Sequence, residues 1–173
     1  MQMLGFFMPA TIASRGVTLV ELLVGLSLFG IIAAFAIPNW QRLQERHRVE
    51  VARDQLINDL QTARVHALQR GAMLQLSRLS NCTWGTSSAS DWSCGWQLVV
   101  KADQAVLLTS ALTSPVQVTF AKTTPLDISA RGDLGTVGER WVIQSRQSAL
   151  NIANTLCLSS ASRLRWQSGS SCS

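Results

Sequence analysis

The sequence predicts an α+β protein in which one long N-terminal helix packs on a β-rich C-terminal head. Three observations lead to this prediction. Residues 17–37 form an almost unbroken apolar run, and residues 38–70 carry an amphipathic helical pattern. Residues 71–173 change to short segments with the two-residue period of strands. At 173 residues the chain has room for one domain and a helical stalk.

The apolar run from Val17 to Ile37 has the length of a single bilayer crossing as a helix. Its one charged residue is Glu21. A charged side chain at the centre of a membrane helix costs roughly 2.5–3.5 kcal/mol on insertion scales. We therefore expect the Glu21 carboxylate to face a partner.

The segment before this run does not follow the order of a secretory signal peptide. Such a signal has a positive region, then an apolar core, then a small-residue cleavage site. Here Arg15 and Gly16 precede the apolar core. Cleavage after Gly16 would leave the core attached and would create a new α-amino group at Val17, four residues before Glu21. Three methionines precede this point and leave the start open: Met1, Met3 and Met8.

The stretch from Ser14 to Pro38 resembles the prepilin signature of type IV pilins and type II secretion pseudopilins. The resemblance implies that residues 1–16 are a leader removed by the prepilin peptidase, and that Val17 is then N-methylated, although the family most often has Phe there. It also implies that Glu21 pairs with the amine of a neighbouring subunit. The protein would be single-pass in the inner membrane, with a periplasmic head, and extracellular in an assembled pilus.

The amphipathic part of the helix is predicted to run from residue 38 to Arg70, where Gly71 is a natural stop. Its apolar stripe follows helical spacing and is expected to pack on a sheet: Val49, Ala52, Leu56, Leu60, Ala63 and Ala67. Arginines on the other faces are interleaved with acidic residues, so we interpret those faces as solvated.

The head is predicted to contain seven short strands separated by Gly- and Ser-containing turns. They cover residues 73–76, 96–100, 105–109, 116–120, 141–145, 154–158 and 163–167.

Four cysteines allow three disulfide pairings in an exported head. We favour Cys82–Cys94 and Cys157–Cys172, because each closes a short Ser-rich loop. With two histidines and no CxxC spacing, we expect no metal site.

The sequence contains no motif for catalysis. It lacks GxSxG, HExxH and a phosphate-binding glycine loop. We expect neither an enzyme, nor a cofactor, nor a small-molecule substrate.

Three segments of the mature chain resemble GspH/FimT-type minor pilins. They are the helix end 59–70, the segment Asp91–Trp96 and the motif SRLR at 162–165, where Ser162 replaces the family's Gly. The FimT resemblance implies a minor pilin, incorporated at the pilus tip, that supports pilus biogenesis and binds DNA for natural transformation. Its partners would be other major and minor pilins and DNA, and its DNA-binding residues Arg163 and Arg165.

The residues themselves agree with a DNA-binding role. Arg163 and Arg165 would point to one face of a strand, in a segment that has no acidic residue after Glu139. Trp166 would face the opposite side and is expected in the core. Arg146 is a further candidate that nothing in the sequence places beside them. The alternative is a purely structural subunit, FimU-like in a pilus or GspH-like in a type II secretion system, with the arginines on a solvated edge strand.

Overall fold

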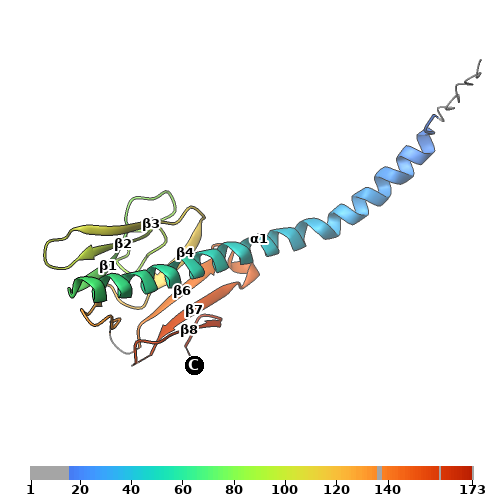
Figure 1. The fold of residues 1–173 in the computed structure, drawn as a ribbon. Helices are drawn as coiled ribbons and strands as arrows, with labels where there is room; N and C mark the ends of the chain where they lie inside the picture. The colour runs from blue at the N-terminus through green and yellow to red at the C-terminus, as the bar shows by residue number, and fades with distance from the viewer. Residues whose placement is uncertain (1–15, 136–137, 160, 173) are drawn as a thin grey trace, which may run out of the picture. The chain divides into compact units, whose positions relative to one another are not determined.

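A computed structural model describes residues 16–135, 138–159 and 161–172, apart from the side chains of Phe35, Ala36 and Pro38. The first element of the described residues is helix α1 (Leu19–Arg70), and the strands follow in the order shown in Figure 1. They are β1 (Leu74–Arg78), β2 (Gly95–Val100), β3 (Val106–Ala111), β4 (Val116–Phe120), β5 (Leu126–Ile128), β6 (Arg140–Ser145), β7 (Ala153–Leu158) and β8 (Leu164–Ser168). A short 3-10 helix, η1 (Ser148–Leu150), lies between β6 and β7.

The chain divides into two compact units, Met1–Trp40 and Gln41–Ser173. In the first unit, α1 is long and apolar enough to cross a membrane, by length and composition. Nearly all its described side chains are exposed, as a lipid-facing helix requires. The predicted membrane segment thus lies in a helix that begins at Leu19.

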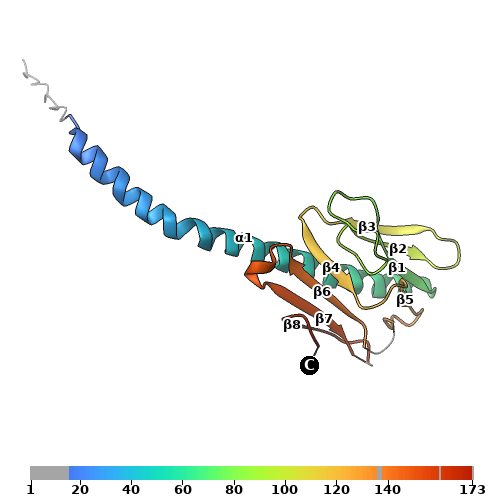
Figure 2. The same cartoon turned by 180° about the vertical axis from the view of Figure 1, so that it is seen from behind.

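The second unit contains two four-stranded antiparallel sheets. Their strand orders are β3-β2-β1-β5 and β4-β6-β7-β8. The part of α1 in this unit runs alongside both sheets, as the two opposite views show (Figures 1 and 2). The predicted α+β class is therefore confirmed.

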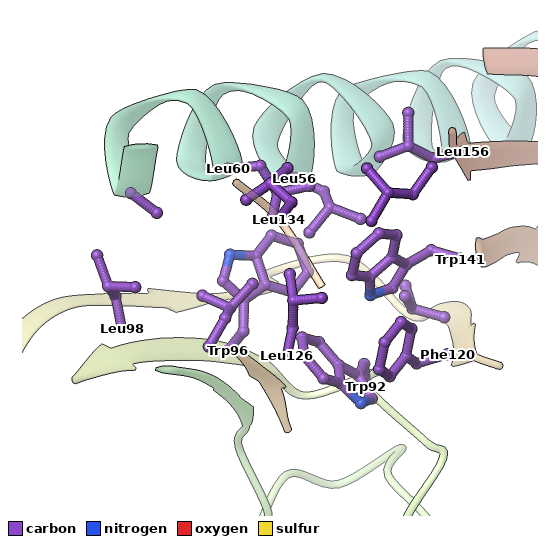
Figure 3. Close-up of a cluster of buried hydrophobic side chains, with 14 of the residues drawn as sticks. Leu56, Leu60, Trp92, Trp96, Leu98, Phe120, Leu126, Leu134, Trp141 and Leu156 are labelled. Carbon is purple, nitrogen blue, oxygen red and sulfur yellow. The ribbon is translucent and has the colours of Figure 1, made fainter. Parts of the chain in front are cut away.

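The apolar stripe of α1 forms one wall of the core. All six predicted stripe residues are at most 2% exposed, so this prediction is confirmed. The opposite wall carries a cluster of large rings (Figure 3). Phe120 stacks on Trp141 with centroids 4.6 Å apart, and Trp92 tilts against Phe120 at 5.0 Å.

A hydrogen bond fixes the helix on this wall. The Trp96 indole Nε1 donates to Asp59 Oδ2 over 2.8 Å, which satisfies the polar atom of a fully buried ring. Every residue of the buried core lies at or beyond Val49. The unit Gln41–Ser173 therefore carries a complete core of its own.

The seven predicted strands are found within two residues of their expected ends, but β5 was not predicted. It pairs with β1 through three residues, Leu74↔Ile128 to Leu76↔Leu126. A segment this short carries too little alternation to mark it as a strand.

Two disulfides close the head. Cys82 joins Cys94 with an S–S distance of 2.05 Å, and Cys157 joins Cys172 with 1.94 Å. These are the two local pairings that the short Ser-rich loops favour. The first closes the loop before β2, and the second ties the C-terminal tail to β7.

Candidate functional site

The SRLR motif forms the tight turn that leads into β8. The Ser159 N–H donates to the Arg163 carbonyl over 3.0 Å, and the Ser162 N–H donates to the Ser159 carbonyl over 2.9 Å. Ser162 has φ +54°, the left-handed conformation that favours glycine. A glycine at this position would adopt this conformation without the strain that a side chain adds.

The end of helix α1 holds this turn in place. The Arg64 guanidinium Nη2 donates to the Ser162 carbonyl, and the Leu134 N–H donates to the Ser162 hydroxyl over 3.0 Å. Gly132 packs on the same part of α1, since a Cβ there would lie 3.4 Å from Leu68 Cγ. The helix end, the turn 129–134 and the SRLR motif thus meet although they are distant in sequence.

Arg64 is a half-buried anchor for this turn rather than a free surface charge. Burial lowers the pKa of its guanidinium, and the nearby Asp133 carboxylate offsets part of that shift. Arginine keeps its proton at any physiological pH, so the effect of this position is structural. The Arg64 guanidinium fixes the turn through its hydrogen bond to the Ser162 carbonyl.

Arg163 and Arg165 are both exposed. In the parts of the chain that the structure describes, neither guanidinium forms an ion pair. The flanking Leu164 packs against the core, so the next residue of β8, Arg165, points away from the core, and Arg163 lies exposed in the turn just before β8. A pair of free guanidinium groups on one face can bind an anion such as a phosphate.

The expectation that Trp166 is a core residue is wrong. Its side chain is 53% exposed, and the Arg53 guanidinium lies over the ring, 4.3 Å from the centroid. Trp166 does face the helix side of the sheet, as alternation predicts. Among the strands that the structure describes, β8 is the edge of its sheet, so no further strand covers the ring.

The structure does not bring Arg146 together with Arg163 and Arg165. Arg146 follows Ser145, whose hydroxyl donates to the buried Glu45 carboxylate over 2.7 Å, and its own Nη1 donates to the Trp84 carbonyl over 2.6 Å. The SRLR turn is fixed instead at Arg64. At a helical rise of about 1.5 Å per residue, Glu45 and Arg64 lie roughly 28 Å apart along α1.

Arg140, which the sequence does not single out, lies on the strand rung that also holds Arg165. The only sequence signal is its place just before a predicted strand, and that does not reveal which strands are neighbours.

At the other end of the chain, Gly16 and Val17 lie just before Thr18 and the start of α1, and the Val17 side chain is 68% exposed. The Glu21 N–H donates to the Thr18 hydroxyl over 3.2 Å, so Thr18 caps the helix. Glu21 lies in the first turn, where the helix dipole favours a negative charge. Arg15, the rest of the expected leader and the three possible starts lie outside the described residues.

No metal centre is present among the described residues, where no group of three or more His, Cys, Asp or Glu side chains is placed to hold an ion.

Comparison with known families gives two matches that together cover most of the chain. Residues 13–37 match the prokaryotic N-terminal methylation motif. Residues 52–166 match the family described as type II transport protein GspH. No curated protein matches the sequence significantly.

Solved structures of two proteins have a similar fold. The type IV minor pilin FimU of Pseudomonas aeruginosa aligns with a TM-score of 0.58 and 20% identity, over 72% of this chain and 92% of FimU. The minor pseudopilin EpsH of the Vibrio cholerae type 2 secretion system aligns with a TM-score of 0.52 and 10% identity, over 70% of this chain and 97% of EpsH.

Proposed function

The chain belongs to the family of the type II transport protein GspH and is a minor pilin or pseudopilin; from that premise we propose that it is a FimT-like minor pilin whose head binds DNA. It is incorporated at the tip of a type IV pilus, where it supports pilus biogenesis and takes part in natural transformation. It acts as a structural and binding subunit.

The proposed route to assembly starts at the N-terminus. The prepilin peptidase cleaves after Gly16, the new amine of Val17 is methylated, and Val17–Ile37 stays in the inner membrane with the head in the periplasm. Glu21 then pairs with the N-terminal amine of a neighbouring pilin. The match of residues 13–37 to the methylation motif supports this route.

One observation carries the DNA proposal: Arg163 and Arg165 are exposed, unpaired within the described residues, and presented by a turn that the half-buried Arg64 fixes. No acidic residue follows Glu139 in the sequence. Glu139 itself is buried and pairs with Lys122 at 2.5 Å, so it does not neutralise the exposed Arg163 and Arg165.

The expected binding is weak and depends strongly on salt. Each phosphate contact contributes a slope of about −0.9 in log K against log salt, so two arginines give about −1.8. At physiological salt two contacts correspond to a gain in affinity on the order of thirtyfold. Such a site becomes effective where several contacts or several subunits act on one long DNA molecule.

The test is binding of a fluorescent duplex by the unit Gln41–Ser173, which holds a complete core, across about 50–200 mM salt. Arg163→Gln/Arg165→Gln is expected to remove most of the affinity and to flatten the salt dependence. The matched control, Arg42→Gln/Arg146→Gln, removes the same charge at the other end of the head and should bind like the wild type.

Equal losses in both variants would mean that binding follows net charge and not this face. No binding by a folded, oxidised head would contradict the DNA proposal and would favour a structural FimU-like or GspH-like subunit.

A further inference from the structure

We propose that Arg140 is a third DNA-contacting residue, and that the DNA backbone crosses the sheet from β8 to β6 over the Cys157–Cys172 disulfide. This inference rests on the proposed function and assigns it a residue and a direction. Its basis is the register of the three strands, which places the Arg140 and Arg165 side chains on the same rung.

The pairing of β6, β7 and β8 places Arg140 and Arg165 on one rung. Arg140 pairs with Cys157 across β6 and β7, and Cys157 pairs with Arg165 across β7 and β8. Directly paired residues on adjacent strands point to the same face of a sheet. Two strand spacings of about 4.8 Å separate the Arg140 and Arg165 backbones by about 10 Å.

That face is the outer one. The neighbours of this rung on each strand, Trp141, Leu156 and Leu164, all pack in or against the core. Successive side chains alternate between faces, so Arg140, Cys157 and Arg165 point away from the core. Arg140 is exposed, like Arg163 and Arg165.

The C-terminal tail borders this row on one side. The Thr155 hydroxyl donates to the Gly169 carbonyl over 2.6 Å, and the Gln167 amide donates to the Ser171 carbonyl. Thr155 and Gln167 form the next rung, and Thr155 is fully covered. The disulfide to Cys172 then returns the tail to β7, between the two arginines of the exposed rung.

Local charges favour an anion on this row. Within the described parts of the chain, Arg140 forms no ion pair. Its sequence neighbour Glu139, which directly precedes β6, is buried and pairs with Lys122. A column of phosphates is the anion that suits cations spaced along a line.

The salt slope tests this proposal. With Arg140 as a third contact the unit Gln41–Ser173 should show a slope of about −2.7, against about −1.8 for two contacts. Arg140→Gln is expected to lower affinity on the order of fivefold at physiological salt and to reduce the slope by about 0.9. Arg140→Lys, which keeps the charge, should retain the slope, and Arg42→Gln should match the wild type.

Separate outcomes identify which proposal fails. Wild-type affinity and slope for a folded Arg140→Gln head, while Arg163→Gln/Arg165→Gln still abolishes binding, would overturn the role of Arg140 and leave the proposed function intact. Absence of DNA binding by the wild type would overturn both. If phosphatidylglycerol vesicles displaced the duplex at equal phosphate concentration, the row would be assigned to anionic surfaces in general and not to DNA.

Discussion

Glu21→Ala is expected to leave the protein cleaved and in the membrane but nearly absent from pili. In the membrane, the Glu21 carboxylate and the α-amine of a neighbouring subunit would each be costly, and the proposed pairing would neutralise both. Loss of the partner leaves one charge unpaired, at roughly 2.5–3.5 kcal/mol on insertion scales. Since 1.4 kcal/mol is a factor of ten, incorporation should fall on the order of a hundredfold. The measurement is the amount of this subunit in sheared pili relative to the membrane fraction.

The structure also gives Glu21 a local role that needs its own control. Its N–H is capped by the Thr18 hydroxyl at the start of α1. Thr18→Ala removes that cap, at about 1 kcal/mol, and leaves the carboxylate in place. We expect Thr18→Ala to be incorporated nearly normally. Normal amounts of Glu21→Ala in sheared pili would contradict the pairing, and an equal defect in Thr18→Ala would assign the effect to helix capping.

Cys157→Ser/Cys172→Ser is expected to lower the free energy of unfolding of the unit Gln41–Ser173 by about 3 kcal/mol. The two cysteines are separated by 15 residues, and a loop of this size gives about that value from chain entropy. The corresponding shift in Tm is on the order of 10 °C, read from thermal unfolding by circular dichroism. The tail should also detach from β7, which weakens DNA binding by disordering the row of Arg140 and Arg165.

The other disulfide provides the control. Cys82 and Cys94 are separated by 12 residues, so Cys82→Ser/Cys94→Ser should lower stability by a similar amount. This loop contains none of the three arginines, and the folded variant should bind DNA like the wild type. An unchanged Tm after removal of Cys157–Cys172 would contradict its structural role. Equal losses of DNA binding in both variants would show that the effect comes from lower stability.

Much of the fold follows from periodicity. The stripe from Val49 to Ala67 repeats at helical spacing over several turns, and such long patterns identify both a helix and its buried face. The helix end was predictable because Gly71 adopts φ +58°, which other residues rarely reach. The strand β5 was missed because Leu126–Ile128 is too short to show alternation.

The sequence predicts only part of the candidate site. Alternation on one strand predicts that Arg163 and Arg165 share a face, but it does not tell which strands are neighbours. Arg140 and Arg165 share a rung because the strands lie in the order β6-β7-β8. Arg146 is far from the SRLR turn because Ser145 contacts α1 at Glu45, whereas Ser162 contacts it at Arg64. The exposure of Trp166 has the same origin, since only the sheet order reveals that β8 is an edge.

Whether this chain is a prepilin is tested most directly by the intact mass of the protein purified from membranes, with and without a co-expressed prepilin peptidase. We predict a mature chain that begins at Val17, carries one added methyl group, and appears only with the peptidase. An uncleaved chain in both preparations, or a chain cut after the apolar run and released from the membrane, would contradict the assignment.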